Sequence, residues 1–344
     1  MKKILLAGAF LIFVFGIIGA WLVYGSTTSF TEDKKVIFIA TGSTFNQVQQ
    51  LLQQQGCINN SKTFTWLAAY TNYNNNVKAG KYVFEKNASV YHILKILKSG
   101  NQSPVKLVIN KMRLLQDVAK KIANNFECDS AAIMNIFTNA DSLKAMGLDS
   151  NTAITLLIPN TYELMWNTPA PKIIKKLYVE QQKFWTAERK KKAAGLNLTP
   201  QQAYILASIV EEETNMQADK GKIASVYLNR LETGMKLGAD PTVKFAMKDF
   251  SLKRIYQKHL LYPSPYNTYQ VFGLPPGPIC TPAISTIDAV LDAPNTTYLY
   301  FVAKPDFKGY SNFATTYTQH LQFAKDYQQA LNVLMAKKAV VSKQ

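Results

Sequence analysis

The sequence predicts an α+β protein with an N-terminal transmembrane helix, a small βααβ domain and a larger mixed α+β domain. Residues 4–24 form one uncharged apolar run. Short β-branched runs then alternate with amphipathic helical runs, and the second half combines helical runs with a Pro- and Gly-rich loop and one clear strand. The expected domain boundaries are residues 1–25, 26–105, 106–195 and 196–340, and the third of these is a mainly helical connecting region.

The amino terminus has the features of an uncleaved membrane anchor. Lys2 and Lys3 precede 21 uncharged residues, enough for a helix to cross the roughly 30 Å hydrocarbon core. A signal peptide is the alternative, but its apolar region is usually shorter and ends at a small-x-small site, whereas Trp21 and Tyr24 are typical of an interfacial belt. The lysines predict a cytoplasmic amino end. We therefore expect a single-pass protein of the cytoplasmic (inner) membrane whose main part is extracytoplasmic (periplasmic).

The charge balance favours an acidic partner. The chain has 39 Lys+Arg against 22 Asp+Glu, a formal net charge of +17. Nucleic acid, membrane headgroups and an anionic polymer all fit such a balance, although Lys-rich solvated surfaces also produce it. Nucleic acid fits poorly with an outward-facing domain, so we expect no nucleic-acid partner.

Several kinds of chemistry have no motif in this sequence. His92, His259 and His320 are far apart, and no HExxH or Cys/His cluster occurs, so we expect no metal site. GxGxxG, Walker and GxSxG motifs are absent, which argues against nucleotide chemistry and the usual serine hydrolases, and we expect no cofactor. The scattered cysteines are expected to be buried thiols rather than disulfides: Cys57, Cys128 and Cys280.

Residues 35–105 predict a compact strand–helix–helix–strand block followed by another helix. A β-branched strand leads through a turn to a helix that Ser43 or Thr44 could cap, and residues 63–70 predict a second short helix. A strand in residues 77–85 precedes a helix that Gly100 closes. This order resembles a LysM-like carbohydrate-binding module, and a packing domain without a ligand is the alternative.

The connecting region is expected to be mostly helical. A strand in residues 104–110 precedes helices in residues 113–126 and 129–139. A single long basic helix is predicted from about Pro171 to Ala194, and its lysine-rich end suits the negative end of a helix dipole.

The stretch "ASIVEEETN" places three glutamates at the end of a predicted helix. Thr199 is a good N-cap, and the pattern after it matches a capping box with Pro at the first helical position. At 100° per residue, Glu213 falls about 20° from the centre of the apolar stripe, whereas Glu211 and Glu212 lie about 120–140° away. Glu213 is thus expected to be a buried carboxyl with a raised pKa, suited to a general acid. The alternative is that the helix frays before Thr214 and leaves Glu213 exposed.

The second half displays polar and aromatic residues on loops. A helix over residues 221–235 carries Asn229 near its end, and "LGADPTVKFAM" follows it as a loop. Residues 264–283 combine five prolines with two glycines, so they can form neither a helix nor a central strand. This loop displays Tyr266, Asn267 and Thr268, a mixture that suits a glycan groove. A strand in residues 296–305 and a final helix over about residues 315–334 complete the chain.

These segments together resemble the YceG-like (MltG) family of endolytic murein transglycosylases. The resemblance rests on "ILASIVEEET", "IASVYLNRLETGMKLGADPTV", "YNTYQVFGLPPGPI" and "YLYFVAKPDFKGYSNFATTYTQH". It covers about residues 155–335 and makes residues 196–340 the catalytic domain. The family's catalytic glutamate is the second acidic position of E-x-E-T, which falls on Glu213. Asn160 and Ser311 stand where the family commonly has Asp and His, and neither is assigned to catalysis.

The resemblance also implies substrate and mechanism. The enzyme would cleave the bond between N-acetylmuramic acid and N-acetylglucosamine, use the muramyl 6-hydroxyl as nucleophile and limit strand length. Its partners would be peptidoglycan strands, the inner membrane and, as candidates, synthases of the elongation or division machinery. The expected substrate-binding residues are Asn229, Asp240, Thr242, Tyr266, Asn267, Thr268 and Gly277.

Two alternatives stay open at this point. A hydrolytic muramidase would need a second carboxylate, and Asp240 would qualify if it lay within about 6–10 Å of Glu213. The family pattern instead gives Asp240 a role in shaping the groove or binding sugar. A non-catalytic peptidoglycan-binding scaffold is the second alternative.

Overall fold

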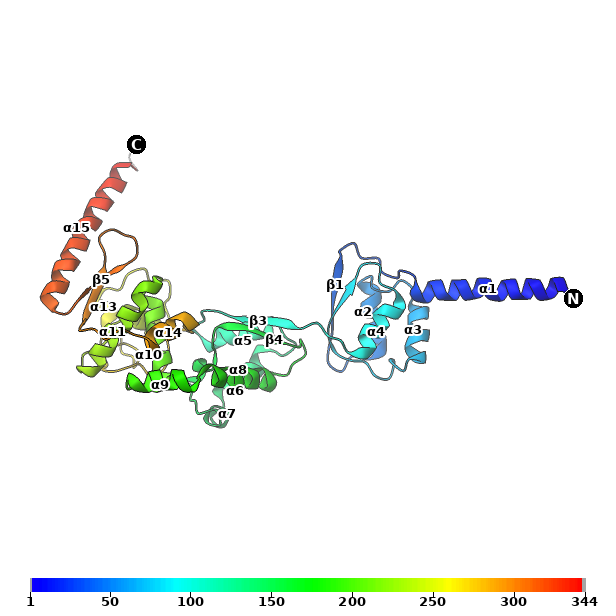
Figure 1. Cartoon of the computed structure of the whole chain (residues 1–344), viewed down its shortest axis with the longest axis horizontal. Coiled ribbons are helices and arrows are strands. Elements are labelled where there is room, and N and C mark those ends of the chain that lie inside the picture. Colours follow the sequence, from blue (N-terminus) through cyan, green and yellow to red (C-terminus); the bar gives the residue numbers. More distant parts are fainter. Residues whose placement is uncertain (1, 342–344) are drawn as a thin grey trace. The chain divides into compact units, whose positions relative to one another are not determined.

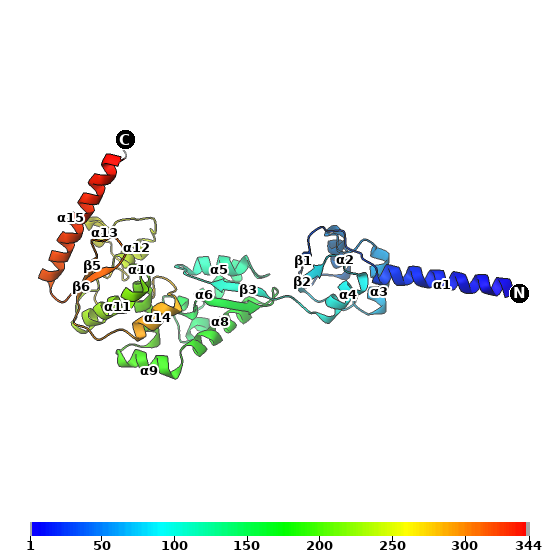
Figure 2. The ribbon, with the colours of Figure 1, turned by 45° about the horizontal axis from the view of Figure 1, so that its top comes forward.

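The described part of the chain is mostly helical, with short two-stranded sheets set among the helices (Figures 1 and 2). The computed structural model describes residues 2–341, with side chains up to residue 336. Within these residues three sheets occur, pairing β1 with β2, β3 with β4 and β5 with β6. The predicted mixed α+β class is confirmed. The chain divides into two units, one of Met1–Leu107, Ile122–Asp129 and Tyr162–Ala170 and one of Val108–Lys121, Ser130–Thr161 and Pro171–Gln344.

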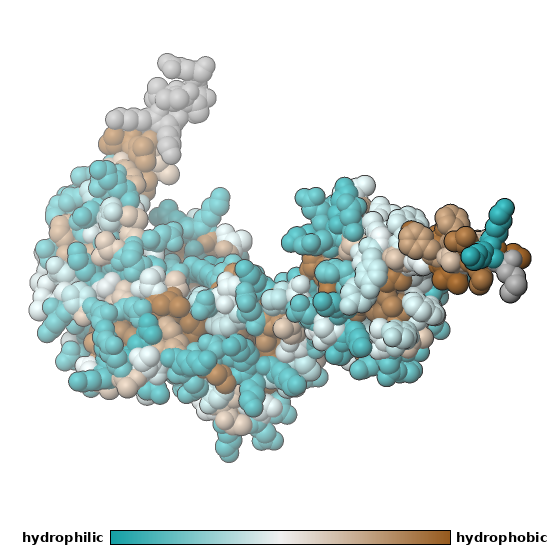
Figure 3. Space-filling view, turned by 45° about the vertical axis from the view of Figure 1, so that its right-hand side comes forward, coloured by the Kyte–Doolittle hydropathy of each residue, from teal (hydrophilic) through white to brown (hydrophobic). Residues whose placement is uncertain are grey.

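Helix α1 (Lys2–Tyr24) is the one helix in the described residues that is long and apolar enough to cross a membrane. It buries none of its residues in the protein. Figure 3 shows it as a continuous apolar surface. This finding fits a single-pass membrane anchor.

The first sheet and its helices form a small folded body with its own core. Lys34 pairs with Glu85 and Ile39 with Gly80 in an antiparallel register. Thr44 forms a capping box at the start of α2, and Gly100 ends α4 in the left-handed conformation. The predicted strand–helix–helix–strand order is present, since the elements are β1 (Lys34–Ile39), α2 (Phe45–Gln54), α3 (Ser61–Tyr70), β2 (Gly80–Glu85) and α4 (Val90–Ser99).

The following region is less purely helical than the sequence indicated. Strand β4 (Asn160–Leu164), which was not predicted, pairs with β3 (Val105–Ile109). The prediction of one long basic helix is wrong, because Thr186 caps a new helix by accepting a hydrogen bond from the Arg189 N–H, and Trp185 before it is buried. The helices here are α5 (Leu115–Ala123), α6 (Ser130–Thr138), α7 (Ala140–Lys144), the 3-10 helix Ala153–Leu156, α8 (Ala170–Phe184) and α9 (Ala187–Gly195).

The last part of the chain is built around α10 (Pro200–Glu213), whose residues enter the large core. The prediction of a loop over residues 237–247 is wrong from Asp240 onward, because Pro241 occupies the first turn of a helix, where a missing N–H does no harm. The strands β5 and β6 are antiparallel, with Phe301 opposite Phe313. The remaining elements are α11 (Gln217–Glu232), α12 (Asp240–Met247), α13 (Gln257–Leu260), α14 (Ile284–Leu291), β5 (Tyr300–Ala303), β6 (Ser311–Ala314) and α15 (Tyr317–Val341).

Candidate active site

Helix α10 carries the three glutamates out of the core. The predicted capping box at Thr199 is present, and residues 203–210 are all buried, so every face of this stretch contacts protein. The helix extends through Glu213 and is followed by Thr214 in an extended conformation. It therefore does not fray before Thr214, and the last turn presents its carboxylates at the boundary of a packed core.

The first two glutamates of the triplet are neutralised by cations. Lys220 Nζ lies 2.9 Å from Glu211 Oε2, and these two side chains are only 8% and 14% exposed. Thr286 also donates to Glu211. Glu212 accepts a fork of hydrogen bonds from Arg113, with Nε at 3.1 Å and Nη2 at 2.9 Å. Glu211 and Glu212, which the helical wheel places away from the apolar stripe, are thus paired with cations.

Glu213 differs from both neighbours because its hydrogen-bond partner is a neutral hydroxyl. Tyr227 Oη donates to Glu213 Oε1 at 2.6 Å. The pKa of Glu213 is raised to about 7, mainly by burial and also by the charge of Asp240, while the Tyr227 hydrogen bond and the charges of Arg230 and Lys244 oppose the rise. Such a carboxyl group holds its proton near neutral pH, which is the property of a general acid.

The pKa of Glu212 moves the other way at the adjacent position. Burial would raise it, but the Arg113 hydrogen bonds and the charge of Lys111 hold it below its usual value. Lys111 Nζ lies 3.1 Å from Glu212 Oε1. Glu212 and Glu213 thus differ in charge state at neutral pH. The difference between their pKa values distinguishes a general acid, Glu213, from a structural carboxylate, Glu212.

Tyr227 is held in place by the core of the domain. It lies on α11, is 1% exposed and packs edge-on against Phe301 with ring centroids 5.9 Å apart. Burial raises its pKa well above the usual value, with Glu213 adding to the effect. The Tyr227 hydroxyl therefore stays protonated. When Glu213 is ionised, its carboxylate can only accept, so the hydroxyl must be the donor of their hydrogen bond.

Asp240 lies at the first turn of α12 and is exposed. Tyr269 Oη donates to its Oδ1 at 2.7 Å. The charge of Asp240 acts on Glu213, so the two carboxyl groups belong to the same electrostatic site. Lys244, one turn further along α12, acts on Glu213 with the opposite sign.

The predicted loop residues form a network inside the protein. Thr242, Asn267 and Thr268 are fully buried. Thr242 and Thr268 share a 2.9 Å hydroxyl contact, and Asn267 Nδ2 donates to the carbonyls of Leu260 and Tyr262. This network fixes the loop that carries Tyr269 to the start of α12.

Asn229 and Gly277 also have structural partners. Asn229 Nδ2 donates to the carbonyls of Thr296 and Tyr298. A Cβ on Gly277 would lie 2.1 Å from the carbonyl oxygen of Asn151 and 2.8 Å from the Tyr266 hydroxyl, so this close approach requires glycine. Burial raises the pKa of Tyr266 to about 12. Sugar contact by any of these residues stays a prediction.

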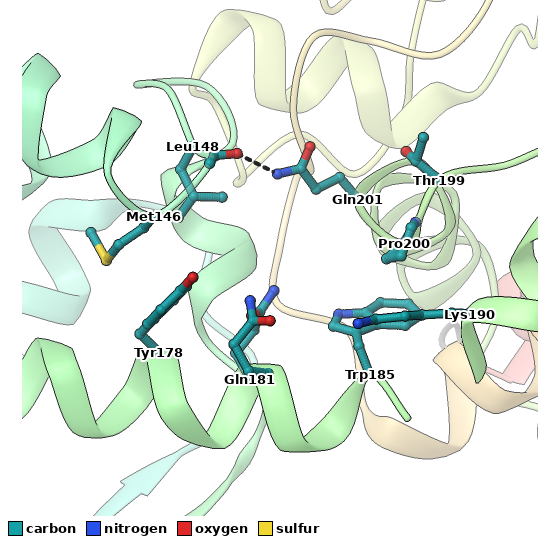
Figure 4. A pocket seen from close by; sticks show the side chains of 11 residues that line it. Met146, Leu148, Tyr178, Gln181, Trp185, Lys190, Thr199, Pro200 and Gln201 are labelled. Atoms are coloured by element: carbon teal, nitrogen blue, oxygen red, sulfur yellow. Dashed lines mark hydrogen bonds between the residues drawn. The ribbon is translucent and has the colours of Figure 1, made fainter. Parts of the chain in front are cut away.

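Two cavities lie at opposite ends of α10. A cavity of about 280 Å³ at the start of the helix is lined by Tyr178, Trp185 and Gln201, and Gln201 donates to the Gly147 carbonyl across it (Figure 4). It lies a full helix length, about 20 Å, from Glu213. A cavity of about 60 Å³ beside Glu212 and Lys244 is large enough for water but not for a saccharide.

The positions that depart from the family pattern have local roles. Asn160 lines a cavity of about 340 Å³ together with Lys111 and Glu211. The Ser311 N–H donates to Asp219 Oδ2 at 2.7 Å and so ties β6 to α11. In the described part of the chain no group of three His, Cys, Asp or Glu residues is placed to hold a metal ion. The three cysteines are free thiols, as predicted, with Cys57 and Cys280 buried.

Sequence reasoning missed two residues around Glu213, Tyr227 and Lys244, whereas Arg230 and Tyr269 lie in segments that it had singled out. Arg230 Nε and Nη1 donate to the carbonyls of Leu299 and Leu237, which holds its charge near the site. Tyr227 and Arg230 lie on the helix that follows the glutamates. Their spacing of three residues places both on one face of α11, a signal that was available in the sequence.

The chain is similar to known proteins over most of its length. The profile of the YceG-like family matches residues 37–326. The chain is 27% identical over 333 residues to the endolytic murein transglycosylase of Bacillus subtilis (strain 168), covering 90% of this chain and 91% of that protein. The protein of the same name from Streptococcus pneumoniae serotype 2 is 27% identical over 301 residues, which span 77% of this chain and 53% of the relative.

A solved structure gives the same result for the fold. The crystal structure of a yceG-like protein from Listeria monocytogenes matches with a TM-score of 0.56 and 27% sequence identity. The match covers 85% of this chain and 99% of that one.

Proposed function

The chain belongs to the YceG-like family, and we propose from this membership and from its site that it is an endolytic peptidoglycan lytic transglycosylase. The enzyme cleaves the bond between N-acetylmuramic acid and N-acetylglucosamine inside glycan strands and leaves 1,6-anhydro ends. The observation that carries the proposal is the Glu213 carboxyl group, whose pKa is raised to about 7 and which accepts a hydrogen bond from a neutral hydroxyl.

One carboxyl group is sufficient for this reaction. Protonated Glu213 gives its proton to the glycosidic oxygen as the bond to the muramyl C1 breaks, and the N-acetylglucosamine hydroxyl leaves. The resulting carboxylate then accepts the proton of the muramyl 6-hydroxyl as that oxygen bonds to C1, which restores the acid. Tyr227 stabilises the ionised intermediate state by its hydrogen bond and fixes the carboxyl orientation.

The hydrogen bonds around Asp240 argue against a hydrolytic muramidase. A second carboxylate would have to activate water. Asp240 Oδ1 is engaged by the Tyr269 hydroxyl, and Glu211 and Glu212 are held in ion pairs. We assign Asp240 and Tyr269 to the wall of the glycan groove. The loop that carries Tyr269 is supported by Thr242, Asn267 and Thr268. The surroundings of that loop are shaped by Asn229, Tyr266 and Gly277.

The remaining assignments complete the proposal. Helix α1 anchors the chain in the cytoplasmic membrane with Lys2 and Lys3 inside, so the catalytic domain lies outside. Residues 26–105 form a LysM-like module, residues 106–195 connect it to the catalytic domain of residues 196–340, and peptidoglycan synthases are candidate partners.

The test is a digest of uncrosslinked nascent glycan strands by the full chain in nanodiscs, with products identified by mass spectrometry. We expect anhydromuramyl ends, and we expect Glu213→Gln to abolish them. Glu232→Gln is the matched control, because Glu232 is an exposed glutamate at the end of α11 and has no assigned role. Reducing muramyl ends that disappear in Asp240→Asn would establish hydrolysis instead, and no products from the unaltered chain would favour a scaffold.

A further inference from the structure

Helix α3 exposes two large aromatic side chains on one face. Trp66 is 61% exposed and Tyr70 is 80% exposed, and their rings stack with centroids 6.0 Å apart and planes 12° from parallel. The opposite face of the helix buries Phe64 and Ala68 in the domain core. An aromatic pair with this exposure is a candidate contact surface, since large exposed apolar patches are uncommon on proteins without a partner.

This face belongs to a groove whose other wall is the apolar helix α1. The groove has a volume of about 800 Å³ and is lined by Gly16, Gly19 and Ala20 of α1 together with Trp66, Leu67 and Tyr70 of α3. Two contacts fix α1 to the domain. Tyr24 packs on Tyr91 with ring centroids 5.2 Å apart, and Val23 packs against the domain core.

The position of the groove along α1 sets its depth. A helix of 23 residues is about 34 Å long, slightly more than the roughly 30 Å of a hydrocarbon core. Gly16 lies about 12 Å from Tyr24 along the axis. With about 2 Å of helix beyond each side of the core, Gly16 lies about 10 Å inside the hydrocarbon, and the groove extends from there to the headgroup level at Tyr24. The α3 wall of the groove therefore lies at the membrane interface.

We propose that the Trp66–Tyr70 face of α3 docks into the headgroup region of the bilayer and forms a second membrane contact beside α1. The inference rests on the proposed anchor. Tryptophan and tyrosine are the side chains that favour this interfacial layer, because an apolar ring and a polar group meet in one residue. Lys62, which also lines the groove, supplies a positive charge for anionic headgroups. The consequence is a βααβ domain held flat on the membrane rather than free on a tether.

Glycan is the competing occupant, because stacked aromatic rings also bind sugars. The structure favours lipid, since the wall opposite the rings is an apolar helix without hydrogen-bonding side chains at Gly16, Gly19 and Ala20. A sugar in this groove would leave its hydroxyl groups unpaired against that wall.

Tryptophan emission in nanodiscs tests the proposal with the full chain. The nanodiscs contain phosphatidylglycerol and phosphatidylcholine whose acyl chains are brominated either at carbons 6 and 7 or at carbons 11 and 12. The chain has 4 tryptophans, which makes single replacements informative. Trp66→Phe tests the α3 face, Trp21→Phe reports on α1, and Trp166→Phe is the matched control in the same unit.

We expect Trp66→Phe to remove roughly half of the bromine-dependent loss of emission, because Trp66 and Trp21 are the two tryptophans placed near the bilayer. The effect should be larger with the shallow bromines than with the deep ones. Trp166→Phe should leave the bromine-dependent loss unchanged. A Tyr70→Ala variant should reduce quenching of Trp66 without unfolding the domain, since Tyr70 is 80% exposed.

Two results would overturn the proposal and can be told apart. If Trp21→Phe reduces quenching and Trp66→Phe does not, the anchor holds but the α3 face is free of lipid. An emission shift of Trp66 on adding soluble glycan fragments would then assign the face to sugar. If neither replacement changes the quenching, the anchor fails as well.

Discussion

The βααβ domain and the catalytic domain differ in what they bury. In the described residues of 26–105, Thr27 is the one buried polar residue in a core of aliphatic and aromatic side chains. The interior around α10, α11 and α14 contains many more, including the lysine of an ion pair. They are Ser208, Asp219, Lys220, Ser225, Thr242, Asn267, Thr268, Thr281 and Thr286, with Glu211 partly buried beside them.

This difference shows which part of the chain accepts a less stable interior because its chemistry needs buried polar groups. A buried polar group destabilises the fold unless it is hydrogen-bonded, so a domain without a chemical task gains nothing from it. Around α10 one polar group positions another, from Lys220 through Glu211 to the last turn of the helix. Glu213 at the end of that helix forms no ion pair with the described residues and accepts a hydrogen bond from the neutral Tyr227 hydroxyl.

The largest effect on this comparison should come from Lys220→Met. It leaves the Glu211 carboxylate buried without its cation, and we expect a loss of about 3–5 kcal/mol in the free energy of unfolding. The exposed pair of Lys34 and Glu85 is the control, because both side chains are more than 60% exposed, and Lys34→Met should change stability by at most about 0.5 kcal/mol. Urea unfolding of the full chain in micelles measures both. Equal effects at the two lysines would contradict the comparison.

Tyr227→Phe should lower the activity more than it lowers the stability, which would support the comparison between the two domains. We expect glycan cleavage to fall about 10–100-fold, because the ionised form of Glu213 loses its donor. The hydrogen bond lowers the pKa of Glu213, so its loss should move the alkaline limb of the pH–activity profile to higher pH. Tyr204→Phe removes a buried hydroxyl that donates to the Leu157 carbonyl, and serves as the control. A limb that stays in place would refute the positioning role.

Glu213→Gln should make the protein more stable at alkaline pH. The folded pKa of about 7 lies above the ordinary value of 4.5, so the native state binds the proton more tightly than the unfolded chain. Stability is therefore unaffected below pH 4.5, falls as the pH rises toward 7 and stays lowered above it. We expect a gain of about 1–3 kcal/mol at pH 8 and almost none at pH 4, allowing for partial exposure. Thermal unfolding at the two pH values would show it, and a pH-independent difference would argue against a raised pKa.

The smallest effect is expected from removing a helix cap, and the loss of stability should be the same in both domains. Thr44 and Thr199 each form a capping box at the start of a helix. Replacing either by alanine should cost about 1 kcal/mol. Urea unfolding of the two variants checks this, and a much larger loss for Thr199→Ala would show that the cap is coupled to the active site.

The sequence predicted local features well because their causes are local. The caps at Thr44 and Thr199, the end of α4 at Gly100 and the position of Glu213 on its helix all follow from a few neighbouring residues. The break at Thr186 was missed because the lysine-rich run after it continues a helical composition, while burial of Trp185 depends on tertiary packing.

The electrostatics of the site could not be predicted, because they depend on long-range contacts. Arg113 reaches Glu212 from 99 residues away in the sequence. Tyr269 reaches Asp240 from a loop 29 residues later. The helical wheel set Glu213 apart from its neighbours, but all three glutamates are half-buried, and the cations that pair with Glu211 and Glu212 were not predicted.

The most direct test of the central claim is a titration of the Glu213 carboxyl group by infrared difference spectroscopy on the full chain. The signal is the carboxyl band that is absent from Glu213→Gln. We predict a protonation midpoint at about pH 7, coinciding with the loss of glycan cleavage at alkaline pH. A midpoint near the ordinary value of 4.5 would contradict the account, because Glu213 would then hold no proton to donate at neutral pH.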